Sequence, residues 1–197
     1  RRAAPLSHAV VAATVLAVTG LAGFGVIGGQ DQAALRPEHF DAKQVTVQPA
    51  GADGVRVREV IDIDFGVYER RGYQRRIPND FGAVVDVTAF SPDANDQVDV
   101  SDFGSDTRIR IGNPNEFFTG QHRYELDYTL PDAELSSGVL ALDIIGNDET
   151  FTTDRFEVVL SGFELADFRC DMGDRNNVGG CEFAENSDGE YVAVIEP

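Results

Sequence analysis

Two runs of alternating apolar and polar residues within 108–130 are the sequence feature that most constrains the fold of this chain. Before an open loop at 112–120, two isoleucines alternate with two arginines. After the loop, four large apolar residues alternate with polar or charged ones: Tyr124, Leu126, Tyr128 and Leu130. A period of two over this length places one face of a strand on a core and the other in water. The pattern therefore predicts two strands of a half-buried sheet.

Similar short segments, separated by turn residues, recur along the chain after residue 44. We expect about nine strands, over 45–47, 55–65, 84–90, 108–111, 121–130, 139–146, 156–160, 165–169 and 191–195. The segment 139–146 is almost uniformly apolar, which predicts a central place in a sheet. This spacing predicts an all-β fold: an antiparallel β-sandwich of the immunoglobulin or fibronectin kind, spanning 44–197.

One carboxylate, Glu59, interrupts the apolar face of the strand expected at 55–65. An isolated buried charge is costly, so a carboxylate on such a face should be paired. The next cations along the chain are Arg75 and Arg76, and we expect a Glu59–Arg75 ion pair that ties the strand to the following loop. The alternative is that Glu59 lies at a wet edge of the sheet.

The first 29 residues contain an uncharged apolar run, 9–27, preceded by two arginines. As a helix this run spans roughly 28 Å, close to the ~30 Å hydrocarbon core of a membrane. Positive charge before the run favours export of the chain that follows it. The run is either an uncleaved transmembrane anchor or a cleaved signal peptide. In both cases we expect 30–43 to be a linker and the β domain to lie at the cell membrane, on its extracytoplasmic side.

The two cysteines, Cys170 and Cys181, both lie in the part expected to leave the cytoplasm. The residues between them have the composition of a loop, and a bridge would close a loop of about 11 residues. An oxidising compartment favours such a bridge, so we predict a Cys170–Cys181 disulfide.

Acidic residues dominate the charge of the chain, with 34 against 16 basic ones and a formal net charge of -18. This balance makes nucleic acid a poor partner. The acidic loop 91–106 offers oxygen ligands for Ca²⁺ through Asp93, Asn95, Asp96 and Asp99. The spacing of an EF-hand is not met, and a solvated loop is the simpler interpretation.

The loop 112–120 carries two adjacent aromatic residues, Phe117 and Phe118, near its tip. They either contact a partner or cover the end of the sandwich. No nucleophile elbow, phosphate-binding glycine loop or zinc-protease motif is present. Only His39 and His122 fall outside the N-terminal segment. We therefore expect neither an enzyme, a cofactor nor a His-based metal site.

The order of five segments resembles a known family: VRVREVIDIDF (55–65), RRIP (75–78), RIRIG (108–112), GQHRYELDYTL (120–130) and LALDIIGN (140–147). They are similar to the N-terminal region of bacterial membrane proteins of the domain-of-unknown-function 2207 family, over roughly 44–197. The resemblance implies a signal or first membrane segment, an extracytoplasmic β domain and further membrane helices beyond residue 197. It implies no reaction, substrate or catalytic residue.

From these features we expect a non-enzymatic interaction or sensing domain of a bacterial integral membrane protein. Its partners would be the membrane, through the N-terminal segment, and an envelope protein. A carbohydrate-binding or carbohydrate-active wall protein is an alternative, which would have to use aromatic residues such as Tyr68 and Tyr73. A structural spacer of a membrane assembly is a third.

Overall fold

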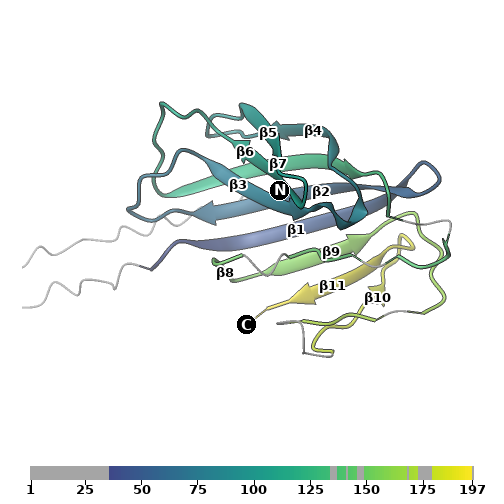
Figure 1. Ribbon diagram of the computed structural model, residues 1–197. Coiled ribbons are helices and arrows are strands. Elements are labelled where there is room, and N and C mark those ends of the chain that lie inside the picture. Colours follow the sequence, from purple (N-terminus) through teal and green to yellow (C-terminus); the bar gives the residue numbers. More distant parts are fainter. Residues whose placement is uncertain are drawn as a thin grey trace, which may run out of the picture. The chain divides into compact units, whose positions relative to one another are not determined.

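The computed structural model describes residues 36–133, 137–140, 142–145, 149–167, 169–172 and 179–196. The regular structure of these residues is β-strand apart from one short 3₁₀ turn (Figure 1), so the expected all-β fold is confirmed. The elements are β1 (His39–Ala50), β2 (Gly54–Asp64), β3 (Tyr73–Pro78), η1 (Asn79–Phe81), β4 (Val85–Phe90), β5 (Val98–Asp102), β6 (Asp106–Ile111), β7 (Gln121–Leu130), β8 (Thr152–Thr153), β9 (Phe156–Leu160), β10 (Ala184–Glu185) and β11 (Tyr191–Ile195). Among these described residues no helix is long and apolar enough to span a bilayer. The N-terminal segment 1–29 lies outside them.

The strands form two sheets that enclose one hydrophobic core. The larger sheet has the order β10-β11-β9-β1-β2-β7-β4, with β8 beside β1, and the smaller has the order β3-β6-β5. Figure 1 shows the small sheet lying over the part of the large sheet that contains β2 and β7. Ring contacts join the layers: Tyr73 of β3 stacks on Tyr124 of β7 and meets Phe40 of β1 edge-on, both at 6.0 Å between centroids.

The large sheet is mixed, whereas the sequence predicted an antiparallel one. β1 pairs antiparallel with β2 but parallel with both β8 and β9. β8 and β9 lie on the side of β1 away from β2, and both run in the same direction as β1. As a result β1 is a central strand, and Val45 faces Glu59 on one side and Val158 on the other.

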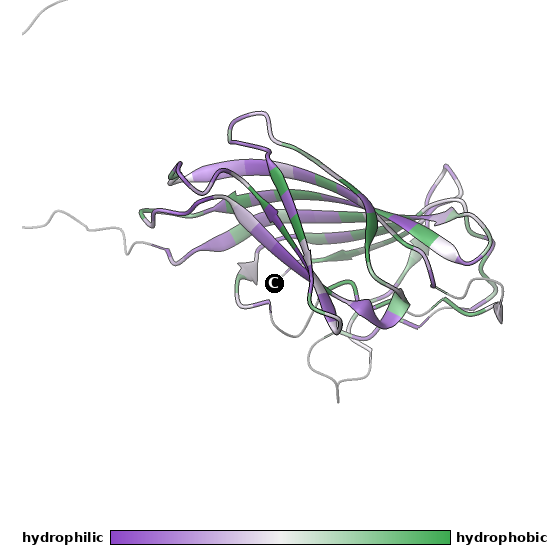
Figure 2. Cartoon of the chain, turned by 45° about the horizontal axis from the view of Figure 1, so that its top comes forward, coloured by the Kyte–Doolittle hydropathy of each residue, from purple (hydrophilic) through white to green (hydrophobic). Residues whose placement is uncertain are grey.

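The alternation in the sequence becomes an alternation of burial along the strands. Figure 2 shows hydrophobic and hydrophilic residues following one another along the long strands of the large sheet. In the β2–β7 pair, Val57 lies opposite Tyr128 and Ile61 lies opposite Tyr124, and all four side chains are buried. Facing pairs of this kind on one side of a sheet stabilise its register, because a slip by one residue would expose them.

Three of the longer strand segments differ from the sequence prediction, and the two-residue strands β8 and β10 were not expected. Residues 39–43, placed in the linker, belong to β1, and the expected loop 73–78 is β3. β5 lies inside the expected acidic loop 91–106, where Val100 pairs with Ile109 of β6. Val98 and Val100 alternate with polar residues in this segment, but its acidic composition indicated a loop.

The prediction of a central strand over 139–146 is wrong for its described residues, 139–140 and 142–145, none of which is in a strand. Leu140, Leu142 and Ile144 pack against the core from an irregular segment, while Val139 is exposed. Nor are the described residues of the strand expected at 165–169 in a strand. A short apolar run indicates burial but does not determine the backbone conformation that buries it.

Candidate functional site

The Glu59 carboxylate lies in the core between the two sheets, where two cations and a phenol surround it. Arg75 Nε lies 3.0 Å from Glu59 Oε1, and Tyr128 donates its hydroxyl to the same oxygen at 2.8 Å. Lys43 Nζ lies 2.9 Å from Glu59 Oε2. The four side chains are almost completely buried. The structure thus places Glu59 beside Arg75, as the sequence suggested, and away from any wet edge.

The remaining donors of Arg75 bind main-chain oxygens. Nη1 donates to the carbonyl of Arg76 at 2.8 Å, and Nη2 donates to the carbonyl of Ile144 at 2.9 Å. A buried guanidinium is tolerated when its donors find partners in this way. The side chain therefore joins the small sheet, through β3, to β2 and to the irregular segment that contains Ile144.

The electrostatics of this cluster fix its charge state. Burial by itself would raise the pKa of Glu59, but the charges of Arg75 and Lys43 and their hydrogen bonds lower it to about 2. Burial lowers the pKa of Lys43, while its contact with Glu59 acts in the opposite direction. Burial and the adjacent carboxylate hold the pKa of the Tyr128 phenol well above its usual value. Glu59 is therefore an ionised structural group at neutral pH and is poorly suited to transfer protons.

A pocket of about 270 Å³ opens beside the cluster. Its lining residues are Phe65, Arg70, Gly72, Tyr73, Gln74, Arg75, Arg76, Glu149, Thr150 and Phe151. Within the described part of the chain β3 pairs only with β6, and β3 supplies four of the residues that line this pocket. The volume lies just below the roughly 300–1,000 Å³ of small-molecule sites, and it suits one side chain or one sugar ring better than a larger ligand.

Two loops, 65–72 and 112–120, lie side by side at the end of the sandwich next to the pocket. Arg70 and Phe118 exchange two main-chain hydrogen bonds, of 2.9 and 2.7 Å. The loops approach most closely at two glycines: a Cβ on Gly72 would lie 2.0 Å from the carbonyl oxygen of Ile111, and one on Gly112 would lie 2.3 Å from that of Arg71. Glycine has no Cβ, so it permits both this approach and the positive φ of these residues.

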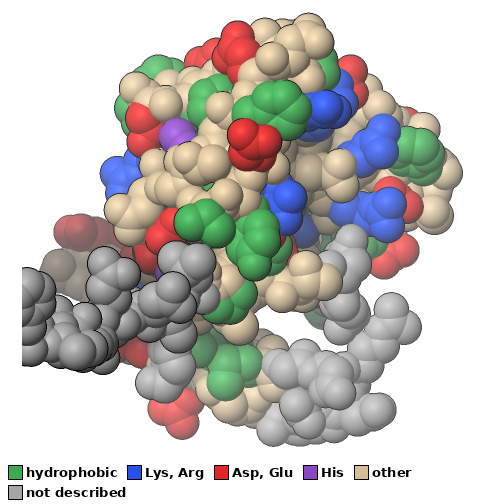
Figure 3. Space-filling view, turned by 90° about the vertical axis from the view of Figure 1, so that its left-hand side faces the viewer, with side chains coloured by type: hydrophobic (Ala, Val, Ile, Leu, Met, Phe, Trp, Pro, Cys, Tyr) green, Lys and Arg blue, Asp and Glu red, His purple; other side chains and the backbone are tan. Residues whose placement is uncertain are grey.

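The two loops present aromatic rings with arginines stacked on them, a surface that we name the aromatic–arginine end. It consists of Val67, Tyr68, Arg70, Arg71 and Phe117. The Cζ atom of Arg70 lies 5.6 Å from the Tyr68 ring centroid, and that of Arg71 lies 4.8 Å from the Phe117 centroid. All three apolar members are exposed. Figure 3, which views this end of the molecule, shows hydrophobic side chains next to clustered Lys and Arg side chains.

The two phenylalanines that the sequence singled out have different surroundings. Phe117 is 54% exposed. Phe118 is partly buried and contacts His122 edge-on, with 5.3 Å between ring centroids. The two alternatives raised by the sequence thus apply to different residues. Phe117 is exposed and available to a partner, whereas Phe118 packs on the domain.

Two of the four side chains proposed for Ca²⁺ accept hydrogen bonds from main-chain nitrogens. Asp93 Oδ1 accepts from the main-chain nitrogen of Arg123 at 3.2 Å, and Asn95 Oδ1 accepts from that of Gln97 at 3.0 Å. Asp96 is exposed, and Asp99 lies on β5. Across the described residues, the carboxylates of this loop do not assemble into a group of three within ligand distance.

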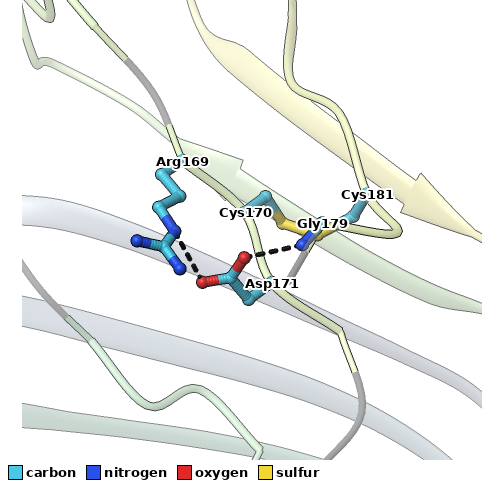
Figure 4. The surroundings of a disulfide bond; sticks show 5 residues. All are labelled: Arg169, Cys170, Asp171, Gly179 and Cys181. Carbon is cyan, nitrogen blue, oxygen red and sulfur yellow. Dashed lines mark hydrogen bonds and ion pairs between the residues drawn. A yellow bond between two sulfur atoms is a disulfide. The ribbon is translucent and has the colours of Figure 1, made fainter. Parts of the chain in front are cut away.

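The predicted disulfide between Cys170 and Cys181 is confirmed, with 5.4 Å between the two Cα atoms. Figure 4 shows Asp171 beside the bridge, where it accepts a hydrogen bond from the main-chain nitrogen of Gly179 at 2.7 Å. Arg169 Nε lies 2.9 Å from the other oxygen of the same carboxylate. The bridge and this carboxylate together hold the two ends of the loop.

Sequence reasoning missed Lys43 and Tyr128 in the buried cluster. Lys43 is the only lysine of the chain, yet it was assigned to the linker. Tyr128 was recognised as buried but not as a hydrogen-bond donor to Glu59. One signal was present: a tyrosine on the buried face of a strand needs a partner for its hydroxyl, and so does a carboxylate.

Comparisons with known proteins give only distant similarity of structure. No family model matches the chain, and no curated protein matches it. Yeast LTA4 hydrolase has 8% identity and a TM-score of 0.45, and the match covers 79% of this chain and 26% of that one. An M1 zinc metallopeptidase from Deinococcus radiodurans has 11% identity and a TM-score of 0.36, with 82% and 39% covered. The chain thus spans well under half the length of these proteins, and such similarity does not establish an enzymatic activity.

Proposed function

We propose that this domain is a non-enzymatic interaction or sensing module of a bacterial integral membrane protein, and that it binds an envelope protein through the aromatic–arginine end. One observation carries the proposal: exposed Tyr68 and Phe117 rings lie under arginines, beside a pocket that β3 helps to line. The resemblance noted in the sequence, to the domain-of-unknown-function 2207 family, is consistent with this role.

The chemistry of this end is that of an energetically important interface. Tyrosine and arginine are the residues most enriched among binding hot spots, together with tryptophan. Arg70 is held by Glu38, which presents its guanidinium in a fixed orientation. Rings and guanidinium groups that are already stacked lose little side-chain entropy when a partner binds.

The charges indicate the kind of partner. The protein has a net charge of -18, yet this end carries two arginines on adjacent positions. Within the described residues Arg71 contacts the Phe117 ring and forms no ion pair. A protein surface with apolar side chains and at least one carboxylate would complement it, and its extended segment could follow the edge of β3 as in strand addition.

The extracytoplasmic location is part of the proposal. It is supported by the Cys170–Cys181 disulfide, because such bridges persist in oxidising compartments. The apolar run at 9–27 supports it further.

A carbohydrate ligand is the second candidate. The pocket combines Gln74, Glu149 and Thr150 with the Phe151 ring, the polar and aromatic lining that a single sugar ring requires. In this case the exposed rings of the aromatic–arginine end would extend the site.

Crosslinking of the full-length protein in intact cells, followed by mass spectrometry, tests the proposal. Phe117→Ser should remove a specific envelope protein from the crosslinked products, and Tyr68→Ser should do the same. Phe103→Ser is a matched control, because Phe103 is also 54% exposed and also lies 4.8 Å from an arginine, Arg108, at another place on the surface. Equal loss in the control, or a partner that survives both changes, would refute this surface. Recovery of wall glycan in place of protein would favour the carbohydrate candidate.

A further inference from the structure

The imidazole of His39, at the start of β1, is held in one orientation. Its side chain is 3% exposed, and Nδ1 lies 2.9 Å from the carbonyl oxygen of Pro37. A carbonyl oxygen can only accept a hydrogen bond, so Nδ1 carries the proton. The other nitrogen, Nε2, faces two carboxylates: Asp41 Oδ1 at 3.1 Å and Asp154 Oδ2 at 3.9 Å.

This arrangement favours a cation between the three atoms. Two carboxylate oxygens lie beside Nε2, while Nδ1 is already directed at the carbonyl oxygen of Pro37. Histidines that bind metals usually donate their other ring N–H to a carbonyl or carboxylate, which is the bond that His39 makes with Pro37.

The distances suit a small metal ion. His39, Asp41 and Asp154 each offer one ligand atom, and all three atoms lie within 4.8 Å of one another. A tetrahedral zinc ion with bonds of about 2.0–2.2 Å separates its ligand atoms by roughly 3.3–3.6 Å. The two separations that involve His39, 3.1 and 3.9 Å, lie on either side of that range. In the described part of the chain, no other group of histidine, cysteine and acidic side chains meets the same criterion.

The neighbouring charges leave the site short of positive charge. Arg36 donates to both oxygens of Asp154, at 2.9 and 3.0 Å, but its side chain is largely exposed and can move aside. Among the described residues, Arg36 forms an ion pair with Asp154 alone, and Asp41 lies within ion-pair distance of His39. Gln121 holds the second oxygen of Asp41 at 2.9 Å, so this ligand is already oriented.

We propose that His39, Asp41 and Asp154 form a binding site for a divalent transition-metal ion, for which Zn²⁺ is the best match. An imidazole nitrogen among the ligands favours zinc over calcium or magnesium, which prefer oxygen ligands throughout. The sequence predicted no His-based metal site, because only His39 and His122 lie outside the N-terminal apolar segment. The fold supplies one, since the parallel pairing of β8 with β1 places His39 opposite Thr152, two residues before Asp154.

Titration of the folded protein with ZnCl₂ tests the site. We expect one saturable ion per chain by calorimetry, together with a rise in the melting temperature. In ¹H–¹⁵N spectra of the histidine side chains, the Nε2 signal of His39 should move while that of His122 stays in place. MgCl₂ in equal amounts should produce neither effect.

Two pairs of variants separate this site from general zinc binding by an acidic protein. Asp154→Asn, at a partly exposed position, should weaken zinc binding at least about tenfold, as should His39→Asn. His122→Asn is the matched control and should leave the affinity unchanged, because among the described residues His122 lies within ion-pair distance of one carboxylate, Asp93 at 3.5 Å. Arg36→Ala should not weaken binding, since it frees an oxygen of Asp154. The proposal would be overturned if Asp154→Asn left the zinc affinity unchanged and the His39 signal did not move. It would also be overturned if His122→Asn weakened zinc binding as much as Asp154→Asn does.

Discussion

Replacement of Glu59 with glutamine tests whether the buried cluster stabilises the two-sheet arrangement. The amide keeps the shape of the side chain but removes the only charge that faces both Lys43 and Arg75, which are 2% and 4% exposed. Removal of one partner from a buried ion pair costs about 3–5 kcal/mol, because the other partner stays buried and uncompensated. We therefore expect Glu59→Gln to lower the free energy of unfolding by about that amount. This is a large part of the about 5–15 kcal/mol that is usual for a domain.

Loss of a proton by Lys43 can reduce this destabilisation in part. Burial already lowers the pKa of Lys43, and the loss of Glu59 removes the main group that opposes this shift. Lys43 can then lose its proton in the variant, whereas Arg75 cannot. The destabilisation by Glu59→Gln should accordingly be smaller at pH 9 than at pH 7.

Urea denaturation followed by far-UV circular dichroism measures this effect, since the chain has no tryptophan for fluorescence. Glu125→Gln is the control: Glu125 lies on β7 and pairs with Arg58 at the surface, so its loss should cost less than about 1 kcal/mol. An unchanged midpoint for Glu59→Gln, or an equal loss in the control, would refute the argument. The triple variant Lys43→Met, Glu59→Leu and Arg75→Met is expected to retain the fold, because apolar residues of similar volume can replace a buried ionic cluster.

Three further outcomes follow from other contacts. Folding lowers the pKa of Glu59 from 4.5 to about 2. The stability that the ionised carboxylate contributes is therefore complete above about pH 4.5 and is lost as the pH falls toward 2. Acid titration should show a loss of roughly 3 kcal/mol in the free energy of unfolding, and this loss should be absent in Glu59→Gln. Reduction of the Cys170–Cys181 bridge should lower the free energy of unfolding by roughly 3 kcal/mol in a urea titration with and without reductant. Gly112→Ala should cost more than about 2 kcal/mol, because a Cβ there would lie 2.3 Å from a carbonyl oxygen. Gly120→Ala, with positive φ but nothing within 4 Å, should cost only about 1 kcal/mol in the same assay.

Local pattern was sufficient for the strands that alternate cleanly. β7, β9 and β11 begin and end where the sequence placed them, and in β7 buried residues alternate with more exposed ones along most of the strand. The same rule failed at 139–146, where an apolar run covers the core without forming a strand in its described residues. Burial can be inferred from such a run, but its hydrogen-bond partners depend on parts of the chain far away.

The candidate sites likewise divide into residues that local pattern reveals and residues that only the fold brings together. Glu59 drew attention because it interrupts an apolar face, and Arg75 was the nearest cation. Lys43 could not be found in this way, because its approach depends on the register in which it lies opposite Ile61. His39 and Asp154 meet only through a parallel pairing between distant segments, which no local periodicity reveals.

The central position of β1 also has a consequence for the order of assembly. One edge of β1 is satisfied early by its hairpin partner β2, whereas the other waits for β8 and β9, over a hundred residues further along. Until that part of the chain is available, β1 presents an unpaired edge with apolar side chains, the kind of surface that recruits other chains into aggregates. A chain that is exported in an extended form would carry this exposed edge for most of its transit. It would then depend on chaperones, or on rapid pairing of β8 and β9 with β1, to avoid aggregation. In the folded domain this edge of β1 is paired, so the dependence ends.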